Sequence, residues 1–116
     1  MKSELFFKWL EGNTIIEDKV DEIAEQFDAI MSGVTETIEE HCNNDEPYLA
    51  YGLMLSYASF INTISKKNPS ILRQLQKWIK RLKDLLEVIA RKVKAENYSI
   101  GVGVPFGISI IISFKI

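Results

Sequence analysis

The spacing of hydrophobic residues predicts helices over most of the first 96 positions. Residues 3–11 form a short amphipathic segment, and Gly12 after it suits the left-handed C-cap of a helix. A second helix is predicted from Thr14, where the sequence Thr-Ile-Ile-Glu has the form of a capping box, to about Cys42. Its apolar residues recur at intervals of three and four and form one stripe: Ile16, Val20, Ile23, Phe27, Ile30, Val34 and Ile38.

The third predicted helix, residues 47–65, contains no charged residue, and its apolar side chains surround the helix axis. A helix of this kind lies in the centre of a protein or in a membrane. Its three tyrosines and Asn62 favour a protein interior or a partner interface over lipid. A fourth helix is predicted over residues 69–96, where apolar residues again recur at helical spacing and no Gly or Pro follows Pro69.

From Tyr98 the apolar period changes to two, which predicts β-strands with one buried face. The even positions to the end of the chain are apolar, and the odd positions are small or polar except for Ile111. A three-residue loop over residues 105–107 keeps the apolar side chains on one face and places Gly107 at a left-handed bulge position. This loop pairs Val104 with Ile108, Val102 with Ile110, Ile100 with Ile112, and Tyr98 with Phe114.

These elements predict a mainly α-helical fold of the α+β class. We expect a small bundle of three long helices plus a short N-terminal helix, followed by a C-terminal antiparallel β-hairpin. The length of 116 residues is common for one domain, and 47% hydrophobic with 26% charged residues is ordinary for a globular chain. We therefore expect a single domain over residues 1–116, with the helical bundle over 1–97 and the hairpin over 98–116.

Charge is divided unevenly along the chain. Residues 1–65 hold three lysines and thirteen acidic residues, a net charge of −10, whereas residues 66–116 hold eleven basic and three acidic residues, a net charge of +8. We expect the acidic second helix to lie beside the basic fourth helix, each exposed pair contributing at most about 1 kcal/mol. The alternative is contact of the basic helix with phosphate or anionic lipid, but Asp84 and Glu87 interrupt it and no aromatic stacking set accompanies it, so nucleic-acid binding is not favoured.

The candidate chemistry is sparse. His41 and Cys42 are the only imidazole and thiol, and a helical Glu-x-x-His metal motif would need a carboxylate where Ile38 stands. Acid pairs three or four residues apart are similar to the carboxylate sites of all-helical, magnesium-dependent nucleotide pyrophosphohydrolases. Those sites use two facing helices, whereas nearly all acids here fall on one predicted helix. We therefore assign no family, no catalytic or metal-binding residue and no cofactor.

The strongest functional expectation is self-association. Both strands of an isolated hairpin are edges, and the outward face carries few of the charges that deter strand pairing. Together with an all-round apolar helix, this leaves more apolar surface than the chain can cover, which favours a two-fold dimer. We expect an assembly or adaptor protein, non-catalytic, that associates with itself or another protein through the third helix and the hairpin residues Ser99, Gly101, Gly103, Ser109, Ile111 and Ser113.

Two alternatives remain open from the sequence. Residues 98–114 are seventeen uncharged residues, close to the shortest transmembrane helix, so a membrane-associated protein is one alternative. An enzyme with a carboxylate site built across a subunit interface is the other. No signal peptide opens the chain, so we expect a cytoplasmic location.

Overall fold

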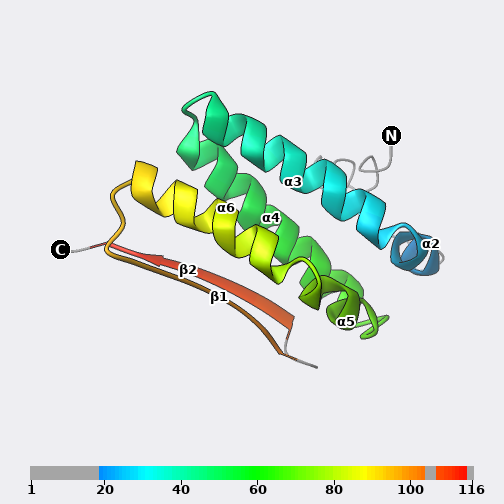
Figure 1. Cartoon of the computed structure of the whole chain (residues 1–116). Helices are drawn as coiled ribbons and strands as arrows, with labels where there is room; N and C mark the ends of the chain where they lie inside the picture. Colours follow the sequence, from blue (N-terminus) through cyan, green and yellow to red (C-terminus); the bar gives the residue numbers. More distant parts are fainter. Residues whose placement is uncertain (1–18, 104–106, 115–116) are drawn as a thin grey trace.

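The computed structural model of the chain describes residues 19–103 and 107–114, and Figure 1 shows how their elements are arranged. The chain is mainly helical and ends in an antiparallel two-stranded hairpin, which confirms the predicted α+β class. The predicted N-terminal helix over residues 3–11 lies outside the described residues. The described elements in chain order are α2 (Val20–Glu25), α3 (Phe27–Asn43), α4 (Pro47–Ser65), α5 (Ile71–Gln76), α6 (Ile79–Lys92), β1 (Asn97–Gly103) and β2 (Gly107–Ser113).

α4 has the bounds predicted for the third helix, whereas the described parts of the second and fourth predicted helices are each divided in two. The predicted start of the second helix at Thr14 lies outside the described residues. The first break is at Gln26, where α2 turns away from the axis of α3 (Figure 1). At the second break the N–H groups of Lys77 and Trp78 bond to carbonyl oxygens three residues back instead of four, at 3.2 and 2.8 Å. Neither break contains Gly or Pro, so we attribute both to tertiary packing that overrides local helix propensity.

α6 ends at Lys92, before the predicted end near Glu96. The reason is Lys94, which has a φ of 57° and lies in the left-handed region. The N–H of Lys94 bonds to Arg91 O at 3.2 Å and the N–H of Ala95 bonds to Ala90 O at 2.9 Å, which together form a Schellman motif. This cap stops the helix and turns the chain toward β1.

The helices and the hairpin form layers around α4. α4 lies between α3 and the hairpin, and α6 packs beside it, over the same face of the hairpin (Figure 1). β1 packs against α6, and β2 packs against α4. Phe27 of α3 and both Tyr57 and Phe60 of α4 are among the largest fully buried side chains, and Ile108 brings β2 into the same core.

The hairpin shows the predicted alternation but a different register. The even positions of both strands face the helices, and the odd positions face away, except for Gly107, which is buried against Asn62. Val102 lies opposite Ile108 instead of Ile110, and Gly103 lies opposite Gly107, so residues 104–106 separate the strands in place of 105–107. The predicted pairing is therefore wrong by two residues. Each side chain keeps its face, because only a shift by an odd number of residues exchanges the two faces.

Asn62 of α4 binds β2 near the start of the strand. Its Oδ1 accepts a hydrogen bond from the N–H of Ile108 at 2.9 Å, and its Nδ2 donates to the carbonyl oxygen of Ile108 at 3.0 Å. Gly107 beside it has a φ of +94°, the positive value that the sequence predicts, and a Cβ at this position would lie 2.2 Å from Asn62 Oδ1. Only glycine allows the amide to approach the strand this closely.

We expect Gly107→Ala to destabilise the fold by about 2 kcal/mol, because it adds left-handed strain and displaces the Asn62 amide from Ile108. Urea denaturation followed by circular dichroism measures this loss. Gly101→Ala is the matched control, because a Cβ there meets nothing within 4 Å, and it should change the free energy of unfolding by less than about 0.5 kcal/mol. Equal losses in both variants would contradict the role assigned to Gly107.

Tyr57 predicts a pH dependence of stability. Its ring is 1% exposed, its hydroxyl donates to Met31 Sδ at 2.7 Å, and burial raises the pKa of its phenol. The unfolded chain releases this proton near pH ~10, whereas the folded chain holds it at higher pH. Tyr57 therefore contributes a stabilisation that is complete below pH ~10 and is lost as the pH rises further, at up to about 1.4 kcal/mol per pH unit.

The measurement is the free energy of unfolding of wild type and Tyr57→Phe at a series of pH values on both sides of the unfolded pKa. The wild type should lose stability more steeply than Tyr57→Phe at the alkaline end. Tyr48→Phe, at a tyrosine that is 70% exposed, should keep the wild-type slope. Parallel curves for wild type and Tyr57→Phe would refute this role of Tyr57.

Candidate functional site

The titratable residues singled out in the sequence do not come together in one cluster within the part of the chain that the structure describes. No group of three or more His, Cys, Asp and Glu side chains able to hold a metal ion occurs among the described residues. Cys42 is buried in the core, and this burial raises the pKa of its thiol, which disfavours the reactive thiolate. The Nδ1 atom of His41 lies 3.1 Å from Glu46 Oε1, and the His41 side chain is half-buried. The end of α3 therefore combines a structural cysteine with a local His–Glu pair.

Acidic residues of the first half of the chain lie next to basic residues of the second half along α3 and α6. Glu39 pairs with Arg81, and Asp45 lies 3.4 Å from the Nζ of Lys92. Asp28 accepts a hydrogen bond at 2.9 Å from the indole of Trp78, directly before α6. The acidic and basic helices are therefore neighbours, as expected from the sequence. These side chains are partly or largely exposed, so each pair adds little to stability.

The C-terminal segment does not form the helix that the membrane alternative requires. Residues 98–103 and 107–113 are strands. Within the part of the chain that the structure describes, no helix has the length and apolar character needed to cross a membrane.

α4 is partly exposed although it contains no charged residue. The sequence predicts that it is buried all round, but only one side of it is buried, and the other side is exposed. Tyr48, Leu49 and Leu55 are 70, 56 and 38% exposed. The exposed residues at intervals of three or four form a line along the helix, which we call the α4 stripe: Tyr48, Gly52, Leu55, Ser59 and Thr63.

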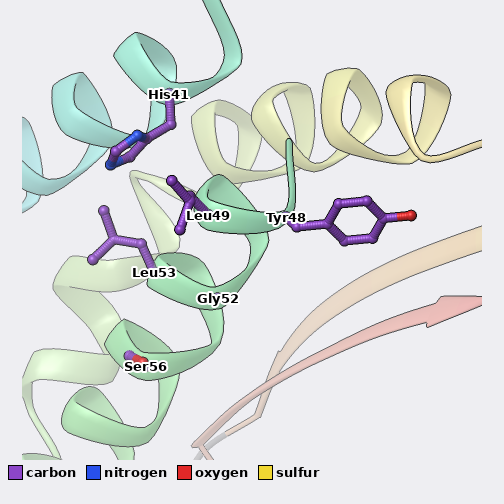
Figure 2. A pocket seen from close by; sticks show the side chains of 6 residues that line it. All are labelled: His41, Tyr48, Leu49, Gly52, Leu53 and Ser56. Atoms are coloured by element: carbon purple, nitrogen blue, oxygen red, sulfur yellow. The ribbon is translucent and has the colours of Figure 1, made fainter. Parts of the chain in front are cut away.

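A shallow hollow of about 380 Å³ adjoins the α4 stripe near its N-terminal end. Figure 2 shows Leu49 and Leu53 on the side of His41, whereas the ring of Tyr48 points away from the imidazole. The lining contains one imidazole, that of His41, and it has no cluster of converging polar groups. The lining residues are His41, Tyr48, Leu49, Gly52, Leu53 and Ser56.

The hairpin contributes a second uncharged surface. Of its residues predicted to mediate association, Gly103 is half-buried and the others are exposed on the face turned away from the helices. They do not converge on a pocket, because they are spread along both strands. Ile111 is the one large apolar side chain among them and is 54% exposed. The predicted set on this face is Ser99, Gly101, Gly103, Ser109, Ile111 and Ser113.

The free edge of β2 lies on the exposed side of α4. β1 lies next to α6 and β2 next to α4, so the unpaired edge of β2 faces away from α6. Asn62 reaches this edge from α4 and binds both backbone groups of Ile108. In an antiparallel strand the backbone groups of every second residue point to the same edge. Those of Ile110 and Ile112 therefore point outward beside the α4 stripe, and we call them the β2 edge.

Sequence reasoning identified the outward face of the hairpin but not the residues of α4 that stay exposed. The absence of charged residues over positions 47–65 is the one feature of the sequence that indicates an unusual surface on this helix. Periodicity could not separate the exposed side from the buried side, because apolar and small residues occur on both.

Five of the six large apolar side chains that are exposed in the described part of the chain belong to α4 or to the C-terminal segment. The sixth, Val88, lies on α6. An interaction surface formed by α4 and the hairpin is therefore the candidate functional site. Comparison with protein-family models, with curated proteins and with solved structures found no match for this chain.

Proposed function

We propose that this chain is a non-catalytic assembly or adaptor protein that self-associates through its C-terminal hairpin and the exposed side of α4. The observation that carries the proposal is the position of the β2 edge beside the α4 stripe, which makes one continuous surface from two elements. Exposed apolar patches of this kind mark interaction sites.

The size of the surface favours the use of both elements. A helix of the length of α4 is about 28 Å long and ~10 Å wide, so one side of it offers roughly 300 Å². A stable interface buries about 800 Å² on each partner. The α4 stripe alone is too small, and the adjoining hairpin supplies further area together with backbone groups able to form hydrogen bonds.

The charge distribution supports a second copy of the same chain as the partner. Neither α4 nor residues 97–113 contain a charged residue. Two copies can therefore bring these surfaces together without facing like charges with like charges across a two-fold axis. The acidic side chains of α3 and the basic ones of α6 stay in solvent in such a dimer.

Gly52 in the α4 stripe is consistent with close approach of a partner. A Cβ at this position would meet nothing within 4 Å, so packing within the chain does not require glycine. Glycine inside a helix costs about 1 kcal/mol relative to alanine. A partner helix packed on this position would benefit from the missing side chain.

We expect the wild-type protein to dimerise in the micromolar range and Leu55→Glu to weaken the dimer by at least about tenfold in Kd, because it places a charge on each copy within the interface. Sedimentation velocity over a range of concentrations measures the association, and circular dichroism checks the helices.

Val88→Glu is the matched control for Leu55→Glu. Val88 on α6 is 37% exposed, against 38% for Leu55, but it lies outside the proposed surface. The control should dimerise like the wild type. A wild type that stays monomeric at high micromolar concentration, or equal weakening by both substitutions, would show that the proposed function is wrong.

A further inference from the structure

We propose that the dimer forms by antiparallel pairing of β2 with β2 of a second copy, about a two-fold axis that passes beside Ile111. This inference rests on the proposed self-association and adds the strand, the register and the residue at the axis. The product is a four-stranded sheet in the order β1-β2-β2-β1.

The two edges of the hairpin differ in their surroundings. β1 lies beside α6, in which seven of fourteen residues are charged, and charged neighbours are a usual protection of an edge strand against further pairing. β2 lies beside α4, which has no charged residue in nineteen positions. The β2 edge is therefore the one that a second strand can approach.

Asn62 restricts the register of the new pairing. Its amide already satisfies both backbone groups of Ile108, in the way that a peptide group of a neighbouring strand would. Among the described residues, none bonds to the outward N–H and C=O groups of Ile110 and Ile112. The free length of the edge thus begins after Ile108 and includes these two residues.

With a two-fold axis beside Ile111, all the outward N–H and C=O groups of Ile110 and Ile112 form hydrogen bonds. Ile110 of each copy then lies opposite Ile112 of the other, and the two pairs exchange four N–H···O bonds. An axis beside Ile110 would instead oppose Ile112 to Ile108, and Asn62 would have to release its strand. The register centred on Ile111 keeps the Asn62 contacts and satisfies the β2 edge.

The same register gives a reason for the presence of an apolar residue, Ile111, on the outward face of the hairpin. At the axis Ile111 faces Ile111 of the second copy in a non-hydrogen-bonded pair, where side chains approach most closely. Each of these side chains, 54% exposed in the single chain, then covers the other. The neighbouring outward residues on both strands are Ser or Gly, apart from Asn97 at the start of β1, and leave room for this contact.

The test is a charge exchange at position 111. Ile111→Lys and Ile111→Glu should each raise the Kd of the dimer at least about tenfold, because each places like charges opposite one another at the axis. An equimolar mixture of the two variants should regain association as a heterodimer, measured by sedimentation velocity. Val88→Lys is the matched control, because Val88 on α6 is 37% exposed but lies outside the proposed surface, and this variant should keep the Kd of the wild type.

A cysteine at the axis provides a second measurement in case charge disturbs the hairpin itself. In a Cys42→Ser background, Ile111→Cys should form a disulfide-linked dimer under mild oxidation, since directly opposed residues at this site lie within disulfide reach. Ser99→Cys in the same background should not form this dimer efficiently. Unchanged helical circular dichroism in each variant excludes general unfolding as the cause.

The outcomes separate this inference from the proposed function. A wild-type dimer that is unaffected at position 111, or that is weakened but not restored by mixing and not cross-linked by Ile111→Cys, overturns the β2 pairing and leaves self-association in place. A wild-type monomer at high micromolar concentration overturns both, and it would direct attention to a strand from a different protein as the occupant of the β2 edge.

Discussion

A two-stranded hairpin is marginally stable in water, and its packing on α4 and α6 is the constraint on which this molecule depends. The inward side chains of β1 and β2 enter the core below these helices, and Asn62 joins α4 to the backbone of Ile108. The packing of the hairpin on the helices also determines which edge adjoins which helix. The edge of β1 lies next to the charged α6, and the edge of β2 lies next to the uncharged α4.

α4 has two roles because of its composition. Its buried side carries Tyr57, Phe60 and Ile61, which pack in the centre of the fold. Its opposite side has to be compatible with solvent in the single chain, and small residues and tyrosine serve this purpose without charge. A surface of this kind can be covered by a partner at little desolvation cost, because no charged group loses its water. This property connects the fold to the proposed assembly.

Within residues 19–103 and 107–114, the titratable side chains do not converge on one site. The acidic residues of α3 face solvent or pair with α6, the buried thiol of Cys42 is packed in the core, and the hollow beside His41 is shallow and mostly apolar. The features that distinguish this surface from an ordinary one are backbone groups and uncharged side chains. Such groups are suited to the association proposed for this chain.

Local pattern predicted much of the fold. The change of period near Tyr98 predicted the hairpin and the face of each of its residues, because alternation is a property of the strand itself. Pro47 and the polar turn before it predicted the start of α4, since proline suits a first helical turn. The interruption at Lys77 and Trp78 could not be predicted, because the residues there are compatible with a continuous helix.

The spacing of residues along the chain is enough to predict the class of the fold, the bounds of α4 and the inward and outward faces of the hairpin. The register, the exposed side of α4 and the free β2 edge depend instead on how the elements pack against one another. Gly107 and Asn62 are 45 positions apart in the sequence, and no periodic pattern shows that one must leave room for the other. Their contact arises only when α4 and β2 pack, because it depends on the distance between two elements that local propensity does not set.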